Sequence, residues 1–213
     1  MARRTKEEAE ETRVQILDAT ERVFHEKGVS RASLAEIAAA AGVSRGAIYW
    51  HFENKTDLFQ AMLERIRTPI EELARACESE DEPDPLGRMH QLLVRLLKRV
   101  ELDPQSRRIH EILRYKVEYT EELGDLRQKM QDLSAECDLR IAKTLRNAVN
   151  RGQLPADLDC QRAAISLHAY MEGLQSNWLL VPAGFSLADE AESLVNSVMD
   201  MLRFSPALRV RAA

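Results

Sequence analysis

The sequence contains few of the residues that interrupt helices or cross-link small folds. Its 213 residues include only 8 glycines, 7 prolines and 3 cysteines. Such a composition favours helix over strand. The odd number and wide spacing of the cysteines argue against a disulfide framework. Because there is also no Cys-x-x-Cys pair, we expect neither a metal site nor a cofactor.

Long apolar runs and the common signatures of enzymes are absent too. No stretch is apolar enough to span a bilayer, and an acidic run follows the basic start where a signal peptide would be apolar. We therefore expect a cytoplasmic protein with no membrane partner. There is no Gly-rich phosphate loop, nucleophile elbow or His-Glu-x-x-His motif, so we expect no enzymatic activity.

The net charge of −5 is unevenly distributed along the chain. Residues 1–67 contain 11 basic and 11 acidic side chains, whereas the remainder contains 19 and 24. Basic side chains also outnumber acidic ones between residues 27 and 55. The distribution is therefore compatible with DNA binding by the N-terminal part, although the whole chain is acidic.

Apolar residues recur at helical spacing along the whole sequence and predict an all-α protein of about nine helices. Two short helices are expected between residues 33 and 51. The longer helices are expected at about 6–27, 54–78, 86–102, 104–117, 120–151, 158–181 and 186–204. Gly28 and Asn54 are the expected end of the first helix and the expected cap of the fourth.

Residues 33–52 have the spacing of a helix-turn-helix. Ser33 and Glu36, three positions later, form a capping box that opens the first helix. Gly42 stands where the turn needs a residue that tolerates a left-handed backbone. Ser44 would cap the second helix.

The second helix of this motif would be a recognition helix in the major groove. Arg45 could bind O6 and N7 of guanine, Gly46 permits close approach, and Ala47 could touch a thymine methyl group. The other polar side chains suit phosphate oxygens. The candidate DNA-binding residues are Arg3, Arg4, Ser33, Ser44, Arg45, Gly46, Ala47, Tyr49, Trp50, His51 and Lys55. The first two would form an arm over the DNA backbone or in the minor groove.

The same spacing also fits an ordinary helical hairpin whose aromatic residues are core residues. For the helix-turn-helix we expect Ile48 and Phe52 in the core and Tyr49 and His51 partly exposed. A helical module that binds another protein through apolar surface is a further alternative.

The segment Ala-Ile-Tyr-Trp-His-Phe-Glu-Asn-Lys-x-x-Leu (47–58), preceded by Ala-Gly-Val, resembles the signature of the TetR family of regulators. The segments at 3–13 and 45–52 resemble its AcrR-like subgroup, which represses multidrug efflux pump operons. The resemblance implies a homodimer with a DNA-binding domain at 1–53 and a ligand-binding and dimerisation domain at 54–213. It carries a DNA role over to Ser33, Ser44, Arg45, Tyr49, His51 and Lys55.

The resemblance also implies that a small apolar or aromatic inducer binds between the middle helices and releases operator DNA. Candidate ligand-binding residues are Ile66, Ile70, Met89, Leu92, Leu93, Leu96, His110, Leu113, Arg114, Cys137, Ile141, Met171, Glu172, Gln175 and Trp178. A TetR-type repressor or activator of an unrelated metabolic operon is the alternative function.

Dimerisation is expected through the last two helices, which the resemblance pairs with their counterparts as a four-helix bundle. These helices are strongly apolar, more so than a thin domain would bury, and the small residues Ala163, Ala164 and Gly173 would permit close approach.

Overall fold

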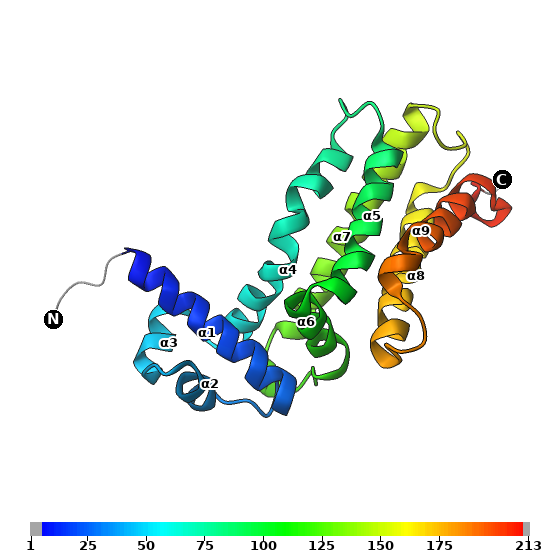
Figure 1. Ribbon diagram of the computed structural model, residues 1–213. Helices are drawn as coiled ribbons and strands as arrows, with labels where there is room; N and C mark the ends of the chain where they lie inside the picture. Colours follow the sequence, from blue (N-terminus) through cyan, green and yellow to red (C-terminus); the bar gives the residue numbers. More distant parts are fainter. Residues whose placement is uncertain (1–5, 211–213) are drawn as a thin grey trace. The chain divides into compact units, whose positions relative to one another are not determined.

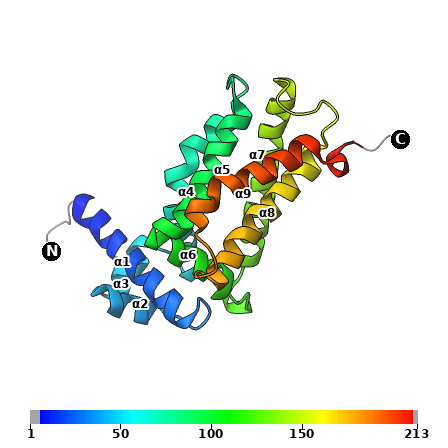
Figure 2. The same ribbon diagram turned by 45° about the vertical axis from the view of Figure 1, so that its right-hand side comes forward.

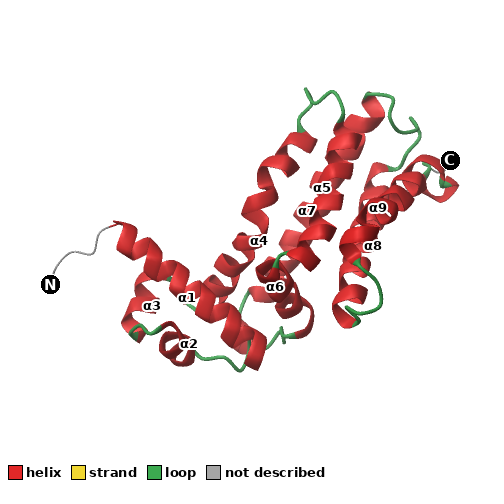
Figure 3. Cartoon of the chain, viewed as in Figure 1, coloured by secondary structure: helices red, strands yellow, loops and turns green. Residues whose placement is uncertain are grey.

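The computed structural model describes residues 6–210, and within this range the chain forms helices and no strand (Figure 3). The helices are α1 (Lys6–Lys27), α2 (Leu34–Ala41), α3 (Arg45–His51), α4 (Lys55–Glu78), α5 (Pro85–Leu102), α6 (Pro104–Tyr115), α7 (Leu126–Asn150), α8 (Cys160–Leu180) and α9 (Leu187–Phe204), with the 3-10 turns η1 (Glu121–Leu123) and η2 (Pro206–Leu208). The expected all-α class is confirmed. The predicted arm residues Arg3 and Arg4 lie outside the described residues.

The described chain divides into two compact units. One unit contains the chain up to Arg67 together with Arg108–Lys129, and the other contains Thr68–Arg107 together with the chain from Met130 onward. The helices α4, α6 and α7 each contribute residues to both units. The functional boundary expected at residue 53 stays a prediction. None of the helices within residues 6–210 has the length and apolar character needed to cross a membrane.

The first unit is built around the inner face of α1, which lies against α2 (Figure 1). Phe24 of α1 and Phe59 of α4 are fully buried, and their ring centroids are 6.3 Å apart. Removing each such side chain from water contributes roughly 1.5–3 kcal/mol to stability. Gly28 ends α1 in a left-handed conformation with φ of 84°, as its position predicts.

The second unit is centred on α5, which packs against α8 and α9, and Figure 2 shows α9 running beside α8. Leu97, Leu167 and Leu202, one from each of these helices, have no exposed surface. Apolar side chains at spacings of three and four place one continuous stripe of each helix in this core.

The small and apolar residues of the last two helices are not all available for a dimer contact, so the sequence expectation was partly wrong. Ala163 and Ala164 are fully buried inside the protomer, and so are Val195 and Val198 of α9. These positions form the stripe that faces the protomer's own core. Of the three small residues expected at the contact, Gly173 alone is exposed.

The start of α7 also differs from the expectation of one helix from about residue 120. Residues 121–123 form the turn η1, and α7 begins at Leu126. Gly124 lies between them with φ of 53° and ψ of −120°, outside the helical region. Because this backbone cannot continue a helix, the chain changes direction there.

Candidate DNA-binding site and ligand-binding region

The first helix of the motif, α2, is capped at both ends as its sequence predicts. The amide of Glu36 donates to Ser33 Oγ at 3.2 Å, and the Ser33 amide donates to Glu36 Oε2 at 2.9 Å. Gly42 ends α2 with φ of 67°, and the amide of Val43 donates to the Ala38 carbonyl at 3.0 Å. The turn between α2 and α3 is therefore fixed by backbone hydrogen bonds and a left-handed glycine.

The Glu36 carboxylate also ties α2 to the end of α1. Lys27 Nζ donates to Glu36 Oε1 at 2.6 Å. The hydrogen bonds from Lys27 and from Ser33 lower the pKa of Glu36 to about 2. One carboxylate therefore caps α2 and holds it beside α1.

The recognition helix α3 has a buried side and an exposed side. Ser44 caps it by accepting a hydrogen bond from the amide of Ala47 at 3.2 Å. Ile48 and Phe52 are buried with 0% and 3% of their surface exposed, which confirms that they are core residues. The short helix therefore depends on its cap and on these two anchors for its position.

The predicted DNA-binding side chains of α3 lie on its outer side. Arg45 and Gly46 are exposed, Tyr49 and Trp50 are 49% and 72% exposed, and His51 is partly exposed. Ser33 and Ser44 are exposed, and Ala47 is partly exposed. Such large exposed aromatic residues on a well-capped helix are typical of a contact surface.

Arg45 and Tyr49 are one helical turn apart on this outer surface and contact each other. Arg45 Nη2 donates to Tyr49 Oη at 3.0 Å. The Arg45 guanidinium carbon lies 5.5 Å from the centre of the Tyr49 ring. Trp50 instead meets His51 edge-on, with ring centroids 4.4 Å apart. The Arg45–Tyr49 pair was not predicted from the sequence, although a spacing of four residues is the signal for it.

Lys55, expected at a phosphate, also stabilises the fold. Its Nζ donates to the carbonyls of Ser30 and Ala32 at 2.8 and 3.1 Å. These carbonyls belong to the loop between α1 and α2, so the ammonium group fixes that loop. Its phosphate contact stays a prediction. Asn54 caps α4 as expected, because its Oδ1 accepts from the Asp57 amide at 2.9 Å.

A buried ion cluster fixes α4 against α1 inside the first unit. The guanidinium of Arg65, with 15% of its side chain exposed, pairs with Asp18 and with Glu21, whose side chain is 1% exposed. Arg65 Nη2 also donates to the Val14 carbonyl at 3.2 Å, and Arg108 Nη1 of α6 lies 3.7 Å from Glu21 Oε2. Burial raises the pKa of Glu21, which marks this carboxyl as dependent on its cationic partners.

The predicted ligand-binding residues are buried or partly buried, and they divide between the two units. Ile66, His110, Leu113 and Arg114 belong to the first unit. The buried members are Met89, Leu93, Met171, Gln175 and Trp178. The partly buried remainder of the second unit comprises Ile70, Leu92, Leu96, Cys137, Ile141 and Glu172. Their ligand role stays a prediction.

Trp178 and the neighbourhood of Cys137 have clear local contacts. Trp178 Nε1 donates to the Phe185 carbonyl at 3.0 Å. Beside Cys137, Asp138 Oδ1 of α7 pairs with His168 Nδ1 of α8 at 2.7 Å. Hydrogen bonding to the Cys137 side chain, followed by the Asp138 contact, raises the pKa of His168 to about 9. Neither Asp138 nor His168 was predicted from the sequence as a site residue.

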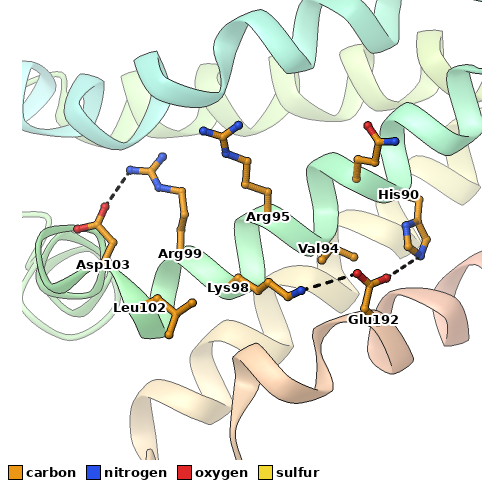
Figure 4. Close-up of a pocket in the computed structure, with 9 residues that line it drawn as sticks. His90, Val94, Arg95, Lys98, Arg99, Leu102, Asp103 and Glu192 are labelled. Atoms are coloured by element: carbon orange, nitrogen blue, oxygen red, sulfur yellow. Dashed lines mark hydrogen bonds and ion pairs between the residues drawn. The ribbon is translucent and has the colours of Figure 1, made fainter.

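A groove of about 380 Å³ lies on the second unit, and no predicted ligand-binding residue lines it. Figure 4 shows that its wall is α5, with Glu192 contributed by α9. Lys98 Nζ and His90 Nε2 each lie 3.7 Å from a Glu192 oxygen, and Arg99 Nη2 lies 3.1 Å from Asp103 Oδ2. Most of its charged groups are therefore already paired.

Together, the capped α2–α3 pair and its exposed cationic and aromatic surface define a helix-turn-helix DNA-binding regulator. Residues 16–62 match the bacterial regulatory proteins of the tetR family. Residues 84–204 match the C-terminal region of MAATS-type transcriptional repressors. The chain belongs to the TetR family, which confirms the resemblance seen in the sequence, and it is a DNA-binding transcriptional regulator of that family.

Relatives match over nearly the full chain. The HTH-type transcriptional regulator TtgR of Pseudomonas putida is 51% identical over 98% of this chain and 100% of its own. The crystal structure of NalD, the secondary repressor of the MexAB-OprM multidrug efflux pump in Pseudomonas aeruginosa, is 36% identical with a TM-score of 0.82, covering 94% and 100% of the two chains. The SmeT–triclosan complex is 28% identical with a TM-score of 0.81, covering 95% and 96%.

Proposed function

We propose that this protein is a homodimeric repressor of a multidrug efflux pump operon, released from its operator by a small apolar or aromatic ligand. DNA binding is assigned to residues 1–53, and ligand binding and dimerisation to residues 54–213. The observation that carries the DNA role is the outer surface of α3, where Arg45, Tyr49 and Trp50 are exposed on a helix anchored by buried Ile48. The efflux assignment is supported by the similarity to NalD, a repressor of the MexAB-OprM multidrug efflux pump. The ligand assignment is supported by the similarity to SmeT, which was solved in complex with triclosan.

The outer surface of α8 supports dimerisation. Ile165, Ala169, Gly173, Asn177 and Leu180 are exposed along one side of this helix at spacings of three and four. Ile165 and Leu180 are 52% and 69% exposed. An exposed stripe that is small at its middle and apolar at its ends suits close packing against a second copy. Gly173→Glu should therefore convert the dimer to monomer in analytical ultracentrifugation.

The ligand would act through α4, which is one continuous helix from Lys55 to Glu78. A ligand held by its C-terminal half would tilt it and move the two recognition helices of a dimer away from the one-turn spacing of about 34–36 Å. Ligand and operator would then oppose each other, with a coupling of roughly 1–3 kcal/mol.

The test begins with DNA fragments selected by the purified dimer from its source genome and then sequenced. Fluorescence anisotropy of a selected duplex gives the operator affinity, with Arg45→Ala as the test variant. Arg75→Ala is the matched control, because Arg75 is 76% exposed but lies in the second unit. We expect Arg45→Ala to weaken binding and Arg75→Ala to leave it unchanged.

Triclosan is the ligand probe in the second step. It should weaken operator binding, and operator should weaken triclosan binding by the same factor. Selected fragments that lie beside a metabolic operon would favour the alternative regulator, and failure to retain any DNA would favour a protein-binding module.

A further inference from the structure

The Arg45–Tyr49 contact joins two exposed side chains of α3, one cationic and the other a tyrosine. Arg45 Nη2 donates to Tyr49 Oη at 3.0 Å, and the guanidinium carbon lies 5.5 Å from the ring centre. Among residues 6–210, no carboxylate pairs with Arg45. Its charge is therefore oriented by a neutral partner and is not neutralised.

A neutral partner of this kind has a defined physical effect on an exposed arginine. A free arginine side chain loses rotamer entropy when it is fixed. The Tyr49 ring restricts the plane of the guanidinium group, and the hydroxyl occupies one of its five N–H donors. Enough donors remain for a bidentate contact with O6 and N7 of guanine.

We propose that Tyr49 is a specificity-positioning residue, which holds the Arg45 guanidinium in the orientation for reading one guanine of the operator. The proposal rests on the proposed function, because it requires that Arg45 meets a base. Tyr49 need not touch DNA to act in this way. Its contribution is to reduce the entropy that Arg45 loses on binding, and this gain is realised only where the correct base is present.

The alternative role for Tyr49 is a hydroxyl contact with a phosphate, and it makes a different prediction. A phosphate contact stabilises every duplex to the same extent, whatever its sequence. Positioning of Arg45 stabilises only the duplex that carries the guanine. The two roles are therefore separated by comparing the selected operator with duplexes in which single base pairs are changed.

The experiment measures the affinities of wild type, Arg45→Ala, Tyr49→Phe and the double variant for this duplex series. The base read by Arg45 is the position at which Arg45→Ala no longer distinguishes base pairs, and wild type should discriminate there by roughly 5- to 150-fold. Tyr49→Phe keeps the ring and removes the hydroxyl. It should lower discrimination at that same position by roughly two- to tenfold and change the other positions little. Adding Tyr49→Phe to Arg45→Ala should cause no further loss of discrimination.

Tyr119→Phe is the matched control. Tyr119 is 43% exposed, compared with 49% for Tyr49, and its ring lies 4.8 Å from the guanidinium carbon of Arg127 in the same unit. Removing this hydroxyl should leave both the affinity for the operator and the discrimination between base pairs unchanged. Thermal melting of each variant shows whether its fold is intact.

Three results overturn the proposal. Tyr49→Phe with wild-type discrimination shows that the hydroxyl does not position Arg45, and equal weakening of all duplexes shows a phosphate contact instead. Both leave the DNA role of Arg45 intact. If Arg45→Ala itself keeps every base preference, then the base-reading role of Arg45 fails, and positioning fails with it.

Discussion

Replacing Arg65 by methionine should lower the free energy of unfolding far more than replacing the nearby Arg67 by methionine. Arg65→Met leaves the Glu21 carboxylate, with 1% of its side chain exposed, without its principal partner. Breaking a buried pair in this way costs about 3–5 kcal/mol. Because Arg108 Nη1 still lies 3.7 Å from Glu21, we expect the lower end, about 3 kcal/mol.

Arg67→Met is the matched control. Arg67 pairs with Glu64 at 3.1 Å, and these side chains are 33% and 57% exposed. An exposed pair of this kind contributes about 1 kcal/mol or less. Both variants remove one positive charge from the same helix, but only Arg65→Met breaks a buried pair. The comparison therefore separates the effect of burial from the effect of the charge itself.

Urea unfolding followed by circular dichroism measures the difference, at one fixed protein concentration because the protein is expected to dimerise. With a slope of about 2 kcal/mol per molar urea, the midpoint of Arg65→Met should fall by about 1.5 M. Because burial raises the pKa of Glu21, the deficit should shrink as the pH is lowered, since protonation removes the unpaired buried charge. Adding Glu21→Gln should recover part of the loss. Equal losses for Arg65→Met and Arg67→Met, or additive losses in the double variant, would refute the reasoning.

Three further outcomes follow from local chemistry. Contacts with Cys137 and then a carboxylate raise the pKa of His168 to about 9 from 6.5, so the stability linked to its proton should be complete below pH 6.5 and be lost as the pH rises through about 9. The urea midpoint should show that step in wild type, and an unchanged step in His168→Gln would contradict it. Burial raises the pKa of Cys77 to about 11 and also raises that of Cys160. Iodoacetamide should therefore label Cys137 first in the native protein, as peptide mass spectrometry would show, and faster labelling of Cys77 would be the contrary result. Gly42→Ala should lower the free energy of unfolding by about 1–2 kcal/mol through its φ of 67° alone, because no atom beyond the neighbouring backbone lies within 4 Å of the added carbon. Thermal unfolding measures this loss, and an unchanged stability would show that the strain is absent.

The helix-turn-helix could be predicted from sequence because its signals are local. Ser33 and Ser44 cap helices whose first turns they directly precede, and Gly42 supplies a backbone conformation that few other residues adopt. The burial of Ile48, on the seven-residue helix α3, and of Phe52, which directly follows that helix, agrees with their spacing of four residues. None of these inferences requires knowledge of a distant part of the chain.

Features that depend on distant residues were predicted less well. The apolar stripe of α9 could equally face the protomer core or a partner, and only its packing against α5 shows that Val195 belongs to the core. Lys55 shows the same limit, because the carbonyls that it binds lie 23 and 25 residues earlier. The break at Gly124 was overlooked because the apolar pattern continues on both sides of it.

The most direct test of the claim that α3 binds operator DNA is hydroxyl-radical footprinting of the selected operator. Wild type should protect two segments whose centres lie about one helical turn, 10–10.5 base pairs, apart or a multiple of that spacing. At the protein concentration that just saturates wild type, Arg45→Ala should protect both segments less, and to the same extent. Protection that persists unchanged in Arg45→Ala, or that shows no paired spacing, would contradict the account.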